Sequence, residues 1–217
     1  ISKGEVLGVV ALEGQGQDSL FEILAGEREC RFGEISFKNS KLKFSHPNDA
    51  IKIGISYVPG DRKTALLPQR SIHENLALTQ FRKLRNWNWI NQSNENALVG
   101  KAISNLDIDT RARSQVKRLS GGNQQKVTIG RWITTGFELL LCFDPTRGID
   151  VGTKNQIYQL LSGLASEGKS ILLFTSELRE IELVCDRVIV LYNGEVYAEF
   201  KASDCSEEKL LNAAHGR

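Results

Sequence analysis

The chain contains no methionine and only four cysteines among its 217 residues. The cysteines, Cys30, Cys142, Cys185 and Cys205, are widely scattered, and none belongs to a CxxC pair or a Cys/His cluster. Structural zinc sites and dithiol redox centres need such clusters, so the sequence argues against both. Cys142 and Cys185 lie in apolar segments, which is typical of buried thiols in a reducing cytosol.

An excess of charge and long apolar runs are missing as well. The chain has 28 Lys and Arg against 26 Asp and Glu, a net charge of +2. This balance is too weak to indicate a nucleic-acid partner. No apolar run approaches the roughly 20 residues that a membrane-spanning helix needs. We therefore expect no nucleic-acid partner and no direct insertion into a membrane, and any membrane role would act through a partner subunit.

Strand-like and helix-like segments alternate along most of the chain. The apolar runs predict strands at residues 5–12, 34–37, 53–58, 139–143, 170–175, 187–192 and 195–200. Apolar periodicity and end signals predict helices at 18–26, 47–52, 71–81, 97–106, 124–134, 153–167, 177–184 and 207–214. This alternation predicts an α/β fold with a mostly parallel sheet. Asn193-Gly194 is a hairpin signal and predicts a small antiparallel addition.

The middle of the chain differs in character from its two ends. Residues 61–118 are polar and helix-like, and they contain Trp87 and Trp89. Ser71 and Glu74 have the spacing of a capping box. We therefore divide the chain into a first core part at 1–60, an inserted helical lobe at 61–118, and the rest of the core at 119–217.

A glycine loop follows the first predicted strand and precedes a predicted helix. Strand, glycine loop and helix in this order form the phosphate-loop arrangement, in which backbone N–H groups cradle an anion. The loop by itself is a weak signal. Its candidate phosphate-binding residues are Gly14, Gln15, Gly16, Gln17, Asp18 and Ser19.

Residues 119–126 have the sequence LSGGNQQK and precede an amphipathic run. Ser120, Gly121 and Gly122 would place a hydroxyl and bare backbone N–H groups at a helix N-terminus, which favours an anion such as phosphate. Ser-Gly-Gly alone favours an ordinary helix cap after a flexible turn. A second block follows at residues 144–153, and the two together make the match specific.

The chain resembles ABC transporter nucleotide-binding domains, and above all the second half of the tandem ATPases of ribose-, galactose- and xylose-type sugar importers. Nearly the whole chain is covered. The blocks that carry the resemblance are residues 119–126, 145–152, 57–59 with 61–63, and 71–76. The resemblance implies an ABC-type P-loop ATPase core with an inserted helical lobe. The family's first strand, with its adenine-stacking aromatic residue, would precede Ile1, so we expect a C-terminal half.

In this family the signature motif closes over ATP that a partner domain holds. The resemblance therefore implies ATP and Mg²⁺ as cofactors, at a composite site shared with that partner. It assigns the partner's ATP to Ser120, Gly121, Gly122, Asn123 and Gln124. It also places Asp150 at the interface between the two domains.

The chain's own phosphate loop departs from the family pattern GxxxxGK[ST]. Gln17 takes the place of the lysine and brings no positive charge. Asp18 takes the place of the hydroxyl residue, where it suits a helix start but repels phosphate. We assign no metal ligand here; the Asp18 carboxylate is the one residue of the loop that could hold Mg²⁺.

The acidic motif is altered too. Phe143 and Asp144 replace the family's Asp-Glu pair, and phenylalanine cannot hold a metal. Asp144 is one methylene shorter than glutamate, so it would be a poor catalytic base. Asp144 is otherwise a strand-end carboxylate that bonds nearby backbone, and the two interpretations stay open. Gly60 replaces the residue that senses the γ-phosphate, and Ser176 replaces the switch histidine, where we expect it to cap the helix at 177–184.

These departures predict an ATP-binding domain of a sugar importer that gives its signature motif to a composite site. The complex would hydrolyse ATP, and the isolated domain would be inactive or very weak. The alternative is a non-catalytic pseudo-ATPase that scaffolds or regulates. The implied partners are the first ATPase half of the same protein and transmembrane permease subunits, at the cytoplasmic face of the plasma membrane. Residues 71–84 are a candidate docking face, or a helix that packs its own core.

Overall fold

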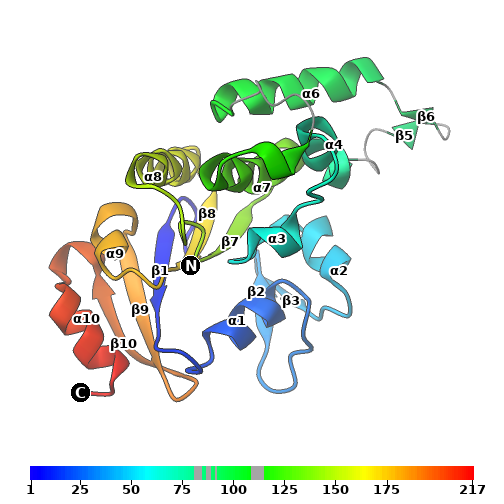
Figure 1. Ribbon diagram of the computed structural model, residues 1–217. Coiled ribbons are helices and arrows are strands. Elements are labelled where there is room, and N and C mark those ends of the chain that lie inside the picture. Colours follow the sequence, from blue (N-terminus) through cyan, green and yellow to red (C-terminus); the bar gives the residue numbers. More distant parts are fainter. Residues whose placement is uncertain (81–84, 87–88, 91, 109–114) are drawn as a thin grey trace. The chain divides into compact units, whose positions relative to one another are not determined.

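A six-stranded sheet organises the computed structural model in Figure 1. The structure describes residues 1–80, 85–86, 89–90, 92–108 and 115–217. The strand order is β10-β9-β1-β8-β7-β4. β1 pairs in parallel with β8 and β9, β7 pairs in parallel with β8, and β10 is antiparallel to β9. The strands are β1 (Val6–Val10), β4 (Ile55–Val58), β7 (Leu139–Phe143), β8 (Ser170–Phe174), β9 (Arg187–Tyr192) and β10 (Glu195–Lys201). The predicted α/β class with a mostly parallel sheet is confirmed.

The inner strands are apolar throughout because both faces of a parallel sheet are covered. All five residues of β1 are buried. A Cβ on Gly8 would come within 2.9 Å of Ile181 Cδ1 and 3.0 Å of Cys185 Sγ, so the middle of β1 has room only for glycine. The β9–β10 connection has positive φ at Asn193 (51°) and Gly194 (81°), which confirms the predicted hairpin.

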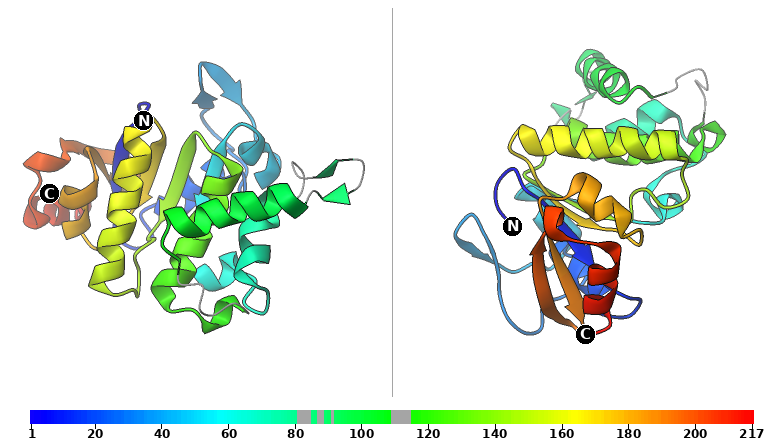
Figure 2. Two further views of the ribbon diagram at one scale, coloured as in Figure 1. Left: turned by 90° about the horizontal axis from the view of Figure 1, so that it is seen from above. Right: turned by 90° about the vertical axis from the view of Figure 1, so that its left-hand side faces the viewer.

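The chain divides into two compact units. The first consists of Ile1–Tyr57, Phe137–Asp144 and Leu161–Arg217. Its helices are α1 (Gln17–Leu24), α2 (Pro47–Lys52), α9 (Arg179–Val184), α10 (Glu207–Ala214) and the end of α8 (Val151–Ser166), with a 3-10 turn at Ala202–Asp204. A separate hairpin joins β2 (Ile35–Phe37) to β3 (Ser40–Leu42), and β3 was not predicted. Figure 2 shows α10 lying against β9 and β10.

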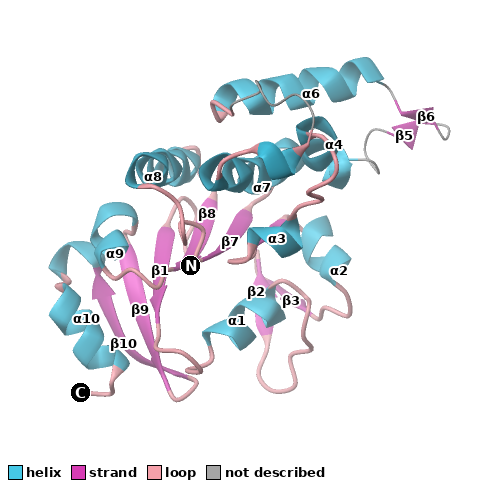
Figure 3. Ribbon diagram, in the orientation of Figure 1, coloured by secondary structure: helices cyan, strands magenta, loops and turns pink. Residues whose placement is uncertain are grey.

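The second unit, Val58–Gly136 with Pro145–Leu160, is mainly helical, as the colours of Figure 3 show. It contains α3 (Arg62–Ala65), α4 (Ile72–Ala77), β5 (Arg85–Asn86), β6 (Trp89–Ile90), α6 (Gln92–Asn105), α7 (Gly121–Thr135) and the start of α8, with 3-10 turns at Leu78–Gln80 and Val116–Arg118. Residues 61–118, the predicted lobe, lie inside this unit, which also takes in α7. Trp87 lies outside the described residues.

Helix α4 begins at a capping box, as predicted. The Glu74 backbone N–H donates to Ser71 Oγ at 3.1 Å, and the Ser71 N–H donates to Glu74 Oε2 at 2.8 Å. The α-helix ends at Ala77, earlier than predicted. Ile72 and Leu76 are buried in the unit's own core with residues of α6 and α7, as the core-packing alternative for α4 expects. Residues 81–84 of the candidate docking face lie outside the described part.

A buried arginine connects α7 to α3 and α4. Arg131 Nε donates to the Asn75 carbonyl at 2.9 Å, and its Nη1 donates to the Ala65 carbonyl at 2.7 Å. Burial lowers the pKa of this guanidinium. Because a buried charge is costly unless it is hydrogen-bonded, these bonds fix α7 against α3 and α4.

All four cysteines are free. Burial raises the pKa of the Cys142 and Cys185 thiols, which keeps them protonated and unreactive. None of the helices in the described residues has the length and apolar character needed to cross a membrane.

Candidate functional site

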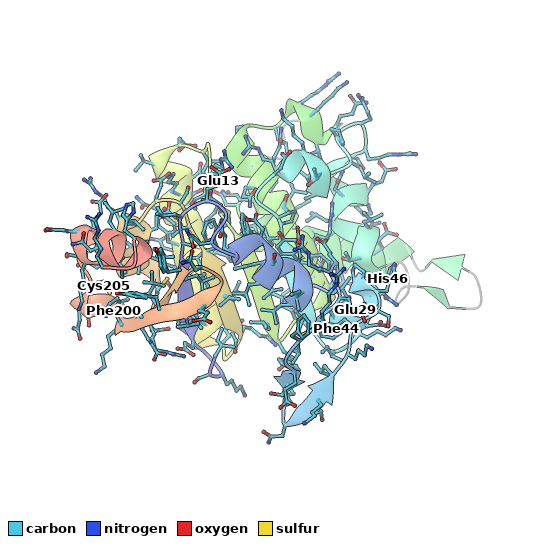
Figure 4. The ribbon with its side chains drawn as sticks, turned by 90° about the horizontal axis from the view of Figure 1, so that it is seen from below. Glu13, Glu29, Phe44, His46, Phe200 and Cys205 are labelled. Carbon is cyan, nitrogen blue, oxygen red and sulfur yellow. The ribbon has the colours of Figure 1, made fainter. Side chains whose placement is uncertain are left out.

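The glycine loop between β1 and α1 is held by the β9–β10 turn. Gly14 and Gly16 have φ of 79° and 102°, and Gly16 caps α1 without a side-chain hydrogen bond. The Asn193 N–H donates to Gln15 Oε1, and the Gly194 N–H donates to the Gln15 carbonyl at 3.2 Å. Figure 4 labels Glu13, which immediately precedes this loop. The β9–β10 turn therefore fixes the loop backbone from one side.

The side chains at the start of α1 bring no cation to this loop. Gln17 is 3% exposed, and its Oε1 has no hydrogen-bond partner among the described residues. Asp18 is exposed in the first turn of α1. Arg28 donates to Ser19 Oγ at 2.6 Å, but its guanidinium is also paired with Glu22 at 2.7 Å. An anion at this helix N-terminus would meet the Asp18 carboxylate.

Phe143 belongs to an aromatic cluster. Its ring stacks on Phe174 with centroids 4.5 Å apart and meets Phe21 edge-on at 5.3 Å. Aromatic side chains therefore surround the end of β7. Among the described residues there is also no group of three or more His, Cys, Asp or Glu side chains that could hold a metal. Phe143 therefore offers no metal ligand at the end of β7.

Asp144 follows Phe143 and is 4% exposed, with φ of 48°. Its carboxylate accepts from Ser176 Oγ at 2.9 Å and from the Ser176 N–H at 3.4 Å. Its own N–H donates to the Phe174 carbonyl at 2.7 Å. Asp144 thus joins the ends of β7 and β8. These bonds resemble the alternative interpretation, in which Asp144 is a strand-end carboxylate that bonds nearby backbone.

The expectation that Ser176 caps the next helix is wrong. Helix α9 begins at Arg179, with Leu178 as its N-cap and no side-chain cap. Thr175 Oγ1, rather than Ser176, accepts from the Glu177 N–H at 3.0 Å. The Ser176 hydroxyl instead donates to Asp144, because the pairing of β7 with β8 brings together residues 32 positions apart.

The start of α7, in the other unit, is a second helix N-terminus that suits an anion. Ser120 is the N-cap, and its Oγ accepts from the Asn123 N–H at 3.3 Å and from Asn123 Nδ2 at 3.1 Å. The Gln124 side chain donates to the Leu119 carbonyl at 3.0 Å. No acidic residue lies in the first turn of α7. The helix dipole at this end is therefore not offset by a carboxylate of the same turn.

The two glycines at the start of α7 are surrounded closely. A Cβ on Gly122 would come within 2.4 Å of Thr153 Cγ2, and a Cβ on Gly121 within 3.0 Å of Arg62 Nη2. Asp150 accepts from the Thr153 N–H at 2.9 Å and from Thr153 Oγ1 at 2.8 Å, so it caps α8. The backbone N–H of Thr153, followed by its hydroxyl, holds the pKa of Asp150 below its usual range. Sequence reasoning gave no role to Arg62 or Thr153, because neither spacing nor periodicity relates them to α7.

Comparison of the sequence with known proteins indicates a family for this chain. A sequence model of the ABC transporter family matches residues 1–147. The chain is 38% identical to a ribose import ATP-binding protein of Agrobacterium fabrum and 36% identical to one of Oceanobacillus iheyensis. Both alignments cover 100% of this chain, but only 43% and 44% of those proteins, so it spans less than half their length.

Solved structures agree with this result. The ATP-binding cassette MJ0796, in a dimeric post-hydrolysis state bound to ADP and Pi, superposes with a TM-score of 0.81 and 25% identity. The superposition covers 93% of this chain and 87% of that one. The family model matches more than half of the residues, and the chain therefore belongs to the ABC transporter family.

Proposed function

We propose that this chain is an ATP-binding domain of a sugar import system. In this proposal it gives the N-terminus of α7 to ATP that a second ATP-binding domain holds. Its own phosphate loop is degenerate. The full-length ribose import ATP-binding proteins support the sugar class, since they match the chain from end to end.

One observation carries the assignment of α7. Its N-terminus has a serine cap, two glycines without side chains and no carboxylate in its first turn. Free N–H groups and an uncompensated helix dipole attract a phosphate. Ser120, Gly121, Gly122, Asn123 and Gln124 would form this surface, and Asp150 would fix the neighbouring loop by capping α8.

The chain's own loop has a lesser role in this proposal. Its backbone N–H groups suit a phosphate, but Gln17 and Asp18 add no positive charge. Asp144 is occupied by Ser176, so it is poorly placed to orient a water molecule. Mg²⁺ would therefore be held mainly by residues of the partner domain, where it would neutralise the phosphate charge.

The proposed partners follow from the class of protein. They are the first ATP-binding half of the same tandem protein and the transmembrane permease subunits. The domain would work at the inner face of the plasma membrane through that permease, and other subunits would select the sugar.

The test is ATP turnover by the full-length protein carrying Ser120→Arg. The new side chain would fill the phosphate position at α7, so we expect turnover to fall at least about a hundredfold. Ser206→Arg is the matched control, because Ser206 is the exposed cap of α10 and its Oγ likewise accepts a backbone N–H. Wild-type turnover by the Ser120→Arg variant would instead identify a scaffolding module.

A further inference from the structure

Arg62 lies beside the start of α7, although it is 59 positions from Gly121 in the sequence. It is the first residue of α3, which Asp61 caps by accepting the Lys63 N–H at 2.9 Å. A Cβ on Gly121 would come within 3.0 Å of Arg62 Nη2 and 3.3 Å of its Cζ. Because Gly121 has no side chain, the Arg62 guanidinium can lie against the start of α7.

One backbone contact orients this guanidinium. Arg62 Nη1 donates to the Arg147 carbonyl at 3.2 Å, in the loop that leads into α8. None of the ion pairs recorded for the described residues includes Arg62. The acidic residue of the neighbouring loop, Asp150, is engaged by Thr153. Most of the N–H donors of Arg62 are thus left for another acceptor.

A guanidinium with unshared donors beside a helix N-terminus suits a phosphate in two ways. The guanidinium fork matches two phosphate oxygens, and the helix dipole adds to its positive charge. A carboxylate in the first turn of α7 would weaken this field, and none is present. The side chain is partly exposed, so an anion can reach it without displacing a packed core.

We infer that Arg62 binds the terminal phosphate of the nucleotide that closes against α7 and supplies the cation at that site. This inference rests on the proposed function, since it needs a nucleotide at the signature helix. It extends the binding surface beyond residues 119–126 to α3. It also gives Gly121 a distinct role, which is to leave space for the guanidinium.

The experiment compares ATP turnover of the full-length protein with Arg62→Gln, Arg62→Lys and Lys63→Gln. Lys63 is the matched control, because it is the neighbouring exposed cation of α3 and its side chain has no ion-pair partner among the residues that the structure describes. We expect Arg62→Gln to lower turnover about tenfold to a hundredfold, as for the loss of a charge-assisted phosphate contact. Arg62→Lys should keep part of the activity, and Lys63→Gln should match wild type.

Gly121→Ala provides a second test that keeps the arginine. Its methyl group would push the flexible guanidinium aside, so turnover should fall while the thermal midpoint stays near that of wild type. Equal turnover in Arg62→Gln and Lys63→Gln would overturn the inference. So would a loss in Arg62→Gln that comes with a matching loss of thermal stability, because Arg62 would then only brace α3 through Arg147.

Ser120→Arg, measured in the same series, separates the two proposals. If Ser120→Arg stops turnover and Arg62→Gln does not change it, only the role of Arg62 fails. If neither variant changes turnover, the proposed function of α7 fails as well.

Discussion

Two helices of this chain, α1 and α7, begin next to glycines, yet their surroundings differ in charge. Helix α1 starts at Gly16 in a left-handed conformation, with buried Gln17 and the Asp18 carboxylate in its first turn. Helix α7 starts at Ser120, has no acidic residue in that turn, and has the Arg62 guanidinium beside it. A helix N-terminus is therefore only part of an anion site, and the neighbouring side chains decide whether its dipole is compensated.

The difference continues in the residues around each helix. At the first unit's strand ends, Phe143 packs among aromatic rings and Asp144 is bonded to Ser176. Around α7, Thr153 and Asp150 secure the start of α8 without occupying the Ser120 end of the helix. Four changes would break or sharpen this comparison.

The largest effect is expected from restoring charge at α1. Gln17→Lys combined with Asp18→Ser replaces a neutral and an acidic residue by the family's cation and hydroxyl. Each change is worth roughly tenfold in phosphate affinity, so we expect ATP to bind about a hundredfold more tightly in calorimetry with Mg²⁺. Gln156→Lys combined with Gln159→Lys, on an exposed part of α8, adds the same two positive charges and controls for net charge. An unchanged affinity would show that the loop backbone, rather than charge, limits binding.

A single methyl group should destabilise the packing of α7. Gly122→Ala would place Cβ within 2.4 Å of Thr153, whose hydroxyl is bonded to Asp150. Overpacking of this kind costs about 2 kcal/mol of unfolding free energy, measurable by urea denaturation. Gly163→Ala in α8 is the control, since nothing lies within 4 Å of its Cβ, and it should stabilise by about 0.5 kcal/mol. If Gly122→Ala had the same unfolding free energy as wild type, the close contact of its Cβ with Thr153 would be contradicted.

A smaller loss is expected where Ser176 bonds Asp144. Ser176→Ala removes a donor to a buried carboxylate, so we expect a loss of about 1 kcal/mol in the same denaturation experiment. Ser203→Ala is the matched control, because its hydroxyl donates to the Asp204 carboxylate at 2.9 Å on the exposed surface. Asp144→Asn with Ser176→Ala should be less than additive, and full additivity would show that the two side chains act independently.

The smallest effect concerns pH. The backbone N–H of Thr153 lowers the pKa of Asp150, so its contribution to stability is complete above the ordinary carboxyl pKa and is lost as pH falls through the lowered value. Wild type should therefore exceed Asp150→Asn in stability at pH 7, and this difference should shrink below about pH 4. A difference that is constant with pH would mean that the charge of Asp150 does not matter.

Short-range features were predicted well from the residues alone. The capping box of Ser71 and Glu74, the hairpin at Asn193 and Gly194, and the helix Pro47–Lys52 were all placed correctly. Strand β7 was predicted to the residue because both faces of its sheet are covered and its apolar run is continuous. The motif at residues 119–126 also predicted a helix N-terminus, but α7 begins at Gly121, three residues before the predicted helix at 124–134.

Other features depend on partners that are distant in sequence. Ser176 has the composition of a helix cap, but the pairing of β7 and β8 offers its hydroxyl the Asp144 carboxylate instead. Arg62 belongs to a block that carries the family resemblance, but the sequence gives it no contact with α7, and only the packing of α3 against α7 brings it to Gly121. Caps and turns are settled by hydrogen bonds within three or four residues, whereas a site's charge depends on side chains that the fold brings together from distant segments.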